Sequence, residues 1–168
     1  MSNKTANPDS ASSGNPADVE SIDAIITSSY KLISGPAGQK RDWARMRTLF
    51  LPGARLIPIN KVAGVRDATG AIPDALDFDG YVARVSDYFD NNGFFETEVA
   101  RRVEQYDRIA HAFSSYESRH DATDPRPFMR GINSFQLFND GRRWWIVSIY
   151  WQQEFPDNPI PEKYLRSS

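Results

Sequence analysis

The 168-residue chain contains no cysteine, only two histidines and no long apolar run. Without cysteine it has no disulfide bond, no thiolate nucleophile and no thiolate metal ligand. No apolar segment approaches the roughly 18 residues that a membrane-spanning helix needs. Because 20 Lys and Arg balance 22 Asp and Glu, the net charge of -2 offers no general attraction for nucleic acid or for an anionic membrane. We therefore expect neither as a partner.

The two histidines are poorly placed to share a metal ion. His111 and His120 lie nine residues apart on one predicted strand. That spacing separates them by about 30 Å and puts them on opposite faces of the strand. The sequence also lacks a glycine-rich phosphate loop and a nucleophile elbow. We expect no metal site and no cofactor.

What the chain does contain is enough apolar material for one core. Hydrophobic residues make up 40% of the sequence and aromatic residues 12%, which suits a single domain of this length. We predict a disordered leader over residues 1–15, one domain over 16–155 and a proline-containing tail over 156–168. The leader is rich in Ser, Asn and Ala and has no apolar signal region, so a cytoplasmic location is the simplest interpretation.

Helical signals occupy the first half of the chain. Spaced apolar residues with N-cap and stop signals predict helices over residues 15–33, 42–50 and 79–91. Asn15 with Pro16 would begin the first helix, and Asp42 would cap the second. Residues 54–59 predict a short strand, and residues 60–76 predict a long loop of the kind that often forms a lid.

After Gly93 the apolar period changes from that of a helix to that of a strand. Four strands are predicted over residues 94–106, 109–120, 128–138 and 144–155. The last two are joined by a turn at Asn139-Asp140-Gly141, which is typical of a β-hairpin. Helices followed by an antiparallel meander indicate an α+β fold, with the helices packed on one concave face of a curved sheet.

Two features of the sequence resemble those of a known family. One is this order of helices and strands, and the other is a set of three stretches, Asp42–Phe50, Gly131–Phe138 and Trp145–Trp151. The chain resembles the NTF2-like superfamily of SnoaL-like and ketosteroid-isomerase-like domains. The resemblance implies a cystatin-like cone in which three N-terminal helices pack on a curved, mostly antiparallel sheet. Since this fold hosts isomerases, dehydratases, cyclases and non-catalytic binding modules, function has to be argued from individual residues.

In ketosteroid isomerases a tyrosine of the first helix and a protonated aspartate of the penultimate strand form an oxyanion hole, and an aspartate of the first strand moves the proton. By resemblance, Tyr30 corresponds to the tyrosine. Asn133 corresponds to the protonated acid, and its amide can donate the same hydrogen bond. Pro58 falls near the position of the proton-moving aspartate, so the usual base is absent.

We assign the general base to His111 instead, because imidazole suits proton transfer at neutral pH. The register that the resemblance suggests puts His111, Phe113 and Glu117 on the concave face. The alternative for His111 is a core histidine that bonds a backbone carbonyl or Glu117. Tyr30 is equally well explained as a core residue whose hydroxyl bonds Asn133.

The remaining predicted pocket residues are mostly apolar. Phe113, Phe135, Val147 and Trp151 would form a wall for a flat hydrophobic ligand, although core packing alone explains them equally well. Glu117 would be a second proton carrier or, alternatively, would form an ion pair with Arg119.

The sequence thus predicts a pocket for a small hydrophobic molecule, with acid/base chemistry of the isomerase, dehydratase or cyclase kind. His111 would be the base, and Tyr30 and Asn133 would be the oxyanion donors. The alternative is a non-catalytic ligand-binding or interaction module that forms a homodimer through the outer face of its sheet. The uncharged outer row predicted for that contact consists of Ala110, Ala112, Ser114, Ile132, Ser134, Ile146, Ser148 and Tyr150.

Overall fold

The computed structural model describes residues 14–59 and 73–166. Most of the predicted leader and of the predicted loop at 60–76 lies outside the described residues. The elements are η2 (Pro16–Asp18), α1 (Ile22–Ile33), α2 (Trp43–Arg47), β1 (Phe50–Pro58), α3 (Phe78–Asn91), β2 (Phe95–Tyr106), β3 (Ile109–Arg119), β4 (Met129–Asn139), β5 (Trp144–Gln153) and η3 (Glu162–Tyr164). Within the described ranges, no helix is both long and apolar enough to cross a membrane.

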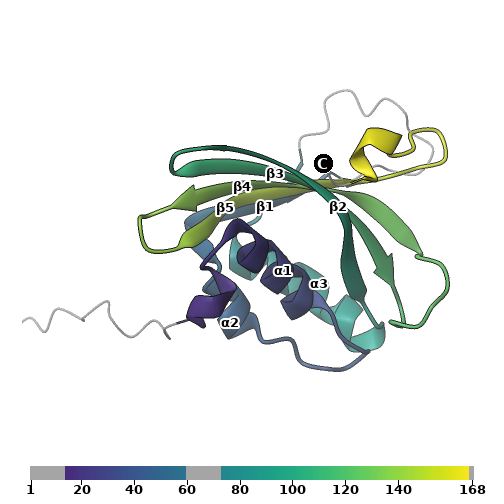
Figure 1. Cartoon of the computed structure of the whole chain (residues 1–168). Helices are drawn as coiled ribbons and strands as arrows, with labels where there is room; N and C mark the ends of the chain where they lie inside the picture. Colours follow the sequence, from purple (N-terminus) through teal and green to yellow (C-terminus); the bar gives the residue numbers. More distant parts are fainter. Residues whose placement is uncertain (1–13, 60–72, 167–168) are drawn as a thin grey trace, which may run out of the picture.

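The strands form one five-stranded sheet in the order β1-β5-β4-β3-β2. Strands β2 to β5 are the antiparallel meander predicted from the sequence. Strand β1 is longer than predicted and pairs with β5 in parallel. The sheet is curved, and α1, α2 and α3 lie on the same side of it (Figure 1). The predicted α+β architecture, with three helices on a curved and mostly antiparallel sheet, is confirmed.

Side-chain caps fix where the helices begin. Asp42 caps α2 as predicted, and Asp77 caps α3. The prediction of one helix starting at Asn15 is wrong, because Asn15 caps only the short η2. A second cap then begins α1: the Ser21 Oγ accepts a hydrogen bond from the Ala24 N–H at 3.0 Å.

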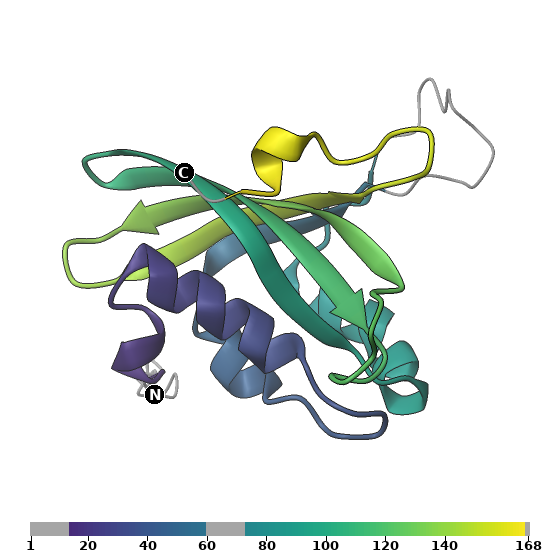
Figure 2. The ribbon, with the colours of Figure 1, turned by 45° about the vertical axis from the view of Figure 1, so that its right-hand side comes forward.

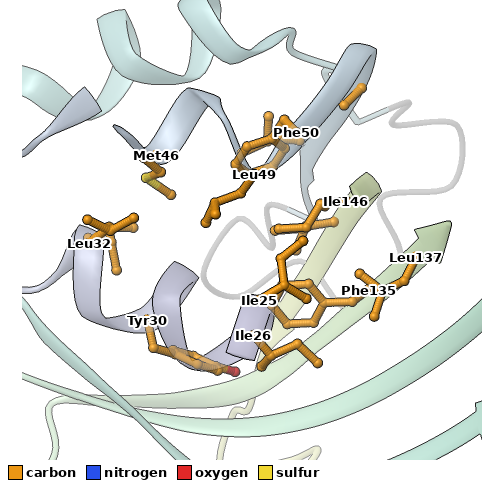
Figure 3. Packing of buried hydrophobic residues seen from close by; sticks show 14 of the residues in the cluster. Ile25, Ile26, Tyr30, Leu32, Met46, Leu49, Phe50, Phe135, Leu137 and Ile146 are labelled. Atoms are coloured by element: carbon orange, nitrogen blue, oxygen red, sulfur yellow. The ribbon is translucent and has the colours of Figure 1, made fainter. Parts of the chain in front are cut away.

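The core lies between α1 and the concave face of the sheet. Ile25 and Ile26 of α1 are fully buried, and Phe135 of β4 is 1% exposed. Figure 3 shows these side chains together with Tyr30, whose ring meets Phe135 edge to face at 6.3 Å between centroids. Burial of one such side chain stabilises the fold by about 1.5–3 kcal/mol, so this contact holds α1 against the strands that carry the site.

The side chains of β3 face the opposite way from the prediction. Ser114 pairs with Asn133, and directly paired residues share a face of the sheet. Ser114 therefore lies on the concave face with Asn133, whereas His111, Phe113 and Glu117 lie on the convex face. Both rows of β3 contain apolar residues, so the apolar pattern alone did not decide between the two registers.

The predicted outer row is consequently a mixture of both faces. Ala110, Ala112, Ser114 and Ile146 are buried on the concave side, with Ile146 fully buried. Ile132, Ser134, Ser148 and Tyr150 remain on the convex side, where Ser134 pairs with Tyr150.

A β-bulge interrupts the alternation of β5. Leu137 pairs with Ile146, but the preceding residue Gln136 pairs with Ser148. Val147 is therefore an extra residue of β5, and it is 36% exposed. Its predicted place in the pocket wall is wrong, because the bulge changes which residues of the strand share a face.

The last described residues, which end at Arg166, return over the convex face of the sheet. Figure 2 shows this segment on the side opposite the helices. The Ser115 Oγ donates a hydrogen bond to the Tyr164 carbonyl at 2.6 Å, and the Arg102 guanidinium donates to the Lys163 carbonyl. The Phe113 ring meets the Tyr164 ring edge to face. This segment thus covers part of the face that the sequence predicted to be a dimer contact.

Candidate functional site

A cavity of about 310 Å³ lies between the helices and the concave face of the sheet. Its size is within the range of small-molecule sites. Most of its lining is aliphatic or aromatic, and the lining residues come mainly from α1, α3 and the five strands. The lining residues are Ser29, Tyr30, Ile33, Met46, Leu56, Tyr81, Arg84, Val85, Tyr88, Phe89, Phe94, Glu96, Tyr116, Met129, Asn133, Phe135, Ile149 and Trp151. Four of the predicted site residues are among them: Tyr30, Asn133, Phe135 and Trp151.

Glu96 is the acidic residue of this lining. It lies near the start of β2, and its pairing with Ser118 of β3 directs both residues to the concave face. One carboxylate oxygen accepts a hydrogen bond from the Ser118 Oγ at 3.0 Å, and the other accepts from the Asn133 Nδ2 at 3.3 Å. This cradle holds the carboxyl group in a defined orientation inside an apolar cavity.

Burial raises the pKa of Glu96 to about 7, while the hydrogen bonds from Ser118 and Asn133 act in the opposite direction. Desolvation disfavours the charged carboxylate, whereas donors to that carboxylate favour it. A carboxyl group that exchanges its proton near neutral pH is suited to general acid/base chemistry.

Arg84 is the only cationic residue among those that line the cavity. Its guanidinium lies 3.5 Å from the Asp74 carboxylate, and its side chain is 39% exposed. Arg84 therefore marks a side of the cavity that reaches solvent, and its ion-pair partner lies outside the cavity lining.

Tyr30 belongs to a directed series of hydrogen bonds. The Asn133 Nδ2 donates to the Tyr30 Oη at 3.1 Å. This is the hydrogen bond expected if Tyr30 is a core residue, which was the alternative interpretation from the sequence. The Tyr30 Oη lies 2.6 Å from the Ser114 Oγ, which itself donates to the Glu98 Oε1 at 2.5 Å. Since a serine hydroxyl has one proton, Tyr30 must be the donor to Ser114. Burial, reinforced by the nearby Glu96 charge, raises the pKa of Tyr30.

Tyr116 contributes a hydroxyl without a hydrogen-bond partner in the described part of the chain. The residue is 1% exposed, and its ring lies over Gly131 of β4, where an added Cβ would be 2.4 Å from the Tyr116 Oη. Burial and the Glu96 charge raise the pKa of Tyr116. A buried donor without a partner costs about 1–3 kcal/mol, which a ligand oxygen could recover.

The predicted base is not at the cavity. His111 lies on the convex face, where its Nε2 is 3.0 Å from the Ser134 Oγ and its ring packs beside Phe113. The alternative was a core histidine bonded to a backbone carbonyl or to Glu117, whereas the structure gives a half-buried histidine whose partner is Ser134. Glu117 likewise forms an ion pair with Arg119 at 2.8 Å, which was its alternative interpretation.

Phe113 and Pro58 also lie away from the cavity lining. Phe113 lines a second cavity of about 230 Å³, between the convex face and the C-terminal segment. Pro58, predicted at the position of the missing base, pairs with Trp151 at the end of β1. The cavity therefore takes its carboxyl group from β2 rather than from β1.

The sequence did not point to Glu96 or Tyr116. Glu96 stands in a stretch with Glu98 and Arg101 that has the appearance of a solvated strand. The signal that could have identified it is cross-strand pairing, since Glu96 lies opposite Ser118 and Glu98 lies opposite Tyr116. Placing the even-numbered residues of β3 on the concave face would have brought both glutamates there too.

Metal coordination has no support in residues 14–59 and 73–166, where no group of three or more His, Cys, Asp or Glu side chains is arranged to hold an ion. The polar groups of the cavity include one carboxyl, one amide, one guanidinium and several hydroxyls. These groups can hold and move a proton and can orient a ligand oxygen.

No known family model matches the sequence, and no curated protein matches it. Solved structures do share its fold. An NTF2-like protein of unknown function from Silicibacter pomeroyi DSS-3 has a TM-score of 0.51 at 16% identity, covering 78% of this chain and 94% of that one. A protein of unknown function with a cystatin-like fold from Nostoc punctiforme PCC 73102 has a TM-score of 0.52 at 10% identity, covering 70% and 80%.

A third similar structure is a protein from Novosphingobium aromaticivorans, provisionally named an aromatic ring hydroxylase. Its TM-score is 0.51 at 13% identity, and the match covers 78% of this chain and 87% of that one. The chain therefore has the NTF2-like, or cystatin-like, fold that its sequence resembles. At these identities the likeness is one of fold, so the chemistry depends on the cavity of this chain.

Proposed function

We propose that the chain binds a small, largely apolar molecule in the 310 Å³ cavity and moves a proton to or from it through Glu96. The observation that carries the proposal is a carboxyl group with a pKa of about 7 in a cavity with mostly aliphatic and aromatic walls. Isomerisation, dehydration and cyclisation all use such a group. The cytoplasmic location expected from the sequence remains a prediction.

In this proposal Glu96 and Tyr116 have complementary roles. The ionised Glu96 removes a proton from the ligand, while the Tyr116 hydroxyl donates a hydrogen bond to the oxygen on which negative charge develops. The absence of any partner for that hydroxyl in the described residues supports this role. Asn133 holds the Glu96 carboxylate and leaves both its oxygens hydrogen-bonded.

The charges around the cavity favour a neutral ligand. An anionic molecule would be repelled by the ionised Glu96, and the one cation of the lining, Arg84, is close to Asp74. A planar ketone, enone or phenol has the required apolar body and a single oxygen for Tyr116.

Binding can be tested by thermal shift with planar ketones, enones, phenols and polycyclic aromatics. A compound that binds only the native state should stabilise the wild type by about 2.7 kcal/mol at 100 times its dissociation constant. Tyr116→Phe should weaken binding about tenfold, because the ligand oxygen loses one hydrogen bond. Tyr150→Phe is the matched control, since Tyr150 is 45% exposed on the convex face. Equal loss in both variants would contradict the role of Tyr116.

Proton transfer is then tested with any ligand found, by following its C–H exchange in D₂O by NMR. The exchange rate should rise with pH around the Glu96 pKa of about 7, because the ionised form is the base. Glu96→Gln should keep binding and lose the exchange, whereas His111→Ala should keep both. Wild-type exchange in Glu96→Gln would refute the proposed chemistry.

A second candidate function is a non-catalytic module that dimerises through the convex face. Tyr150 and Val147, which are 45% and 36% exposed, lie on β5 and favour it. Burial of such a patch is commonly provided by a second copy of the chain. Sedimentation at micromolar concentration should then give a dimer that Tyr150→Glu converts to a monomer. A monomeric wild type would contradict this candidate.

A further inference from the structure

A series of hydrogen-bonded groups leads from the cavity toward solvent between α1 and the sheet. It begins at Tyr30, which lines the cavity, and continues through the Ser114 Oγ at 2.6 Å. It ends at the Glu98 carboxylate, 2.5 Å from the Ser114 Oγ. Tyr30 comes from α1, Ser114 from β3 and Glu98 from β2, so the tertiary fold is what brings the three groups together.

The outer end of the series reaches water. The Glu98 side chain is 24% exposed, whereas Ser114 is fully buried. Arg101 donates hydrogen bonds to both Glu98 oxygens, at 2.7 and 2.6 Å. Arg101 also pairs with Asp23 of α1, whose side chain is 89% exposed. This pairing fixes the position of the carboxylate and leaves it accessible to solvent.

The hydrogen bonds all run in one direction. Asn133 donates to Tyr30, so the Tyr30 proton is free to point to Ser114, and the Ser114 proton points to Glu98. Each hydroxyl oxygen therefore accepts on the cavity side and donates on the solvent side. Proton transfer along hydroxyl groups requires this ordering, because each oxygen must receive one proton as it releases another.

We propose that Tyr30, Ser114 and Glu98 form a proton-transfer chain between the cavity and solvent, separate from Glu96. A proton donor in the cavity, such as the O–H group of a bound phenol, gives a proton to the Tyr30 Oη as the hydroxyl proton of Tyr30 moves to the Ser114 Oγ. The Ser114 proton moves in the same event to the Glu98 carboxylate, which then releases a proton to water. One proton leaves the cavity, both hydroxyls are restored, and no electrons are transferred.

The transfers along this chain are concerted. Burial disfavours a tyrosinate at position 30, as the raised pKa of Tyr30 reflects, so the residue gains a proton while it loses one. Glu96 is not a member of the chain, because the group between Glu96 and Tyr30 is the Asn133 amide, which donates a hydrogen bond to each. The chain thus stands whether or not Glu96 acts on a ligand.

The test needs no ligand. With tyrosine labelled at Cζ with ¹³C, the full-length protein in mixed H₂O and D₂O shows separate signals for O–H and O–D forms, which report hydroxyl exchange. The Tyr30 hydroxyl should exchange about tenfold or more faster than that of Tyr116, which is also buried but has no hydrogen-bond partner among the described residues.

Variants then locate the path. Ser114→Ala removes the middle oxygen and should slow Tyr30 exchange about tenfold or more; Glu98→Gln should do the same, since an amide cannot take up the proton. Ser115→Ala is the matched control, because the Ser115 hydroxyl bonds the Tyr164 carbonyl on the other face. Ser114→Thr keeps the hydroxyl and should restore wild-type exchange.

Three outcomes would overturn the proposal. One is equal Tyr30 and Tyr116 exchange in the wild type. Another is unchanged Tyr30 exchange in both Ser114→Ala and Glu98→Gln. The third is Tyr30 exchange that follows the opening rate of the α1 backbone amides in every variant, since exchange would then occur by local unfolding.

Discussion

The two faces of the sheet carry similar chemistry in opposite surroundings. On the concave face Glu96 bonds Ser118, and on the convex face His111 bonds Ser134. The helices enclose the first pair, and burial raises the pKa of Glu96 to about 7. The second pair lies on the convex face, and the C-terminal segment covers part of that face (Figure 2). Enclosure by the helices is therefore what gives the concave face a carboxyl group with a raised pKa.

The largest difference between the faces should appear in packing. Phe135→Ala removes a ring that is 1% exposed between α1 and the sheet, and it should lower the free energy of unfolding by about 3–5 kcal/mol. Phe113→Ala removes a half-buried ring that packs on Tyr164 and should cost about 1–2 kcal/mol. Urea denaturation measures both. Equal losses would mean that the C-terminal segment makes the convex face a second core.

The next effect concerns pH. The Glu96 pKa rises from 4.5 to about 7 on folding, so between these values the unfolded chain releases a proton that the native chain retains. The free energy of unfolding of the wild type therefore falls as pH rises from about 4.5 to 7. Glu96→Gln removes this dependence and should be more stable than wild type by about 3 kcal/mol at pH 8, with no gain at pH 4.5.

Urea denaturation at pH 4.5 and pH 8 checks this prediction. Glu104→Gln is the control, because Glu104 is an exposed residue of the same strand. A Glu96→Gln protein that is less stable than wild type at pH 8 would show that the hydrogen bonds from Ser118 and Asn133 outweigh the cost of burying the charge.

The smallest effect is expected on the convex face. His111→Ala removes one hydrogen bond, to Ser134, and a ring contact with Phe113. It should lower the free energy of unfolding by about 1 kcal/mol and leave ligand binding unchanged. If the binding isotherm of this variant differs from that of the wild type, His111 on the convex face affects ligand binding in the cavity, which would contradict this prediction.

Most of the fold could be predicted from the sequence, because the patterns that indicate its helices, strands and turns are local. The Asp42 cap, the Asn92-Gly93 stop and the change of apolar period after it each depend on neighbouring residues. The same is true of the turn at Asn139-Asp140-Gly141. The parallel pairing of β1 with β5 depends instead on residues far apart in the sequence, such as Phe50 and Ile146, which are separated by 96 positions. No local sequence pattern predicts this pairing.

The candidate site could be predicted only in part, because its composition depends on which side chains of each strand point to the concave face. Tyr30 and Asn133 were placed at the cavity by the family resemblance, and both line it. The face of β3 was assigned wrongly because both rows contain apolar residues. This one error placed His111 in the predicted pocket and left Tyr116 out of it. Glu96 was not predicted as a site residue for the same reason. Its position on the concave face follows from its pairing with Ser118 of β3.

Gly131 has a consequence for how this cavity can be reshaped. It is not part of the lining, yet a Cβ there would meet the Tyr116 Oη at 2.4 Å and the Gln152 carbonyl oxygen at 2.5 Å. The phenol ring occupies the space that the glycine leaves on the neighbouring strand. The volume of the cavity therefore depends on residue 131, although this position does not line the cavity.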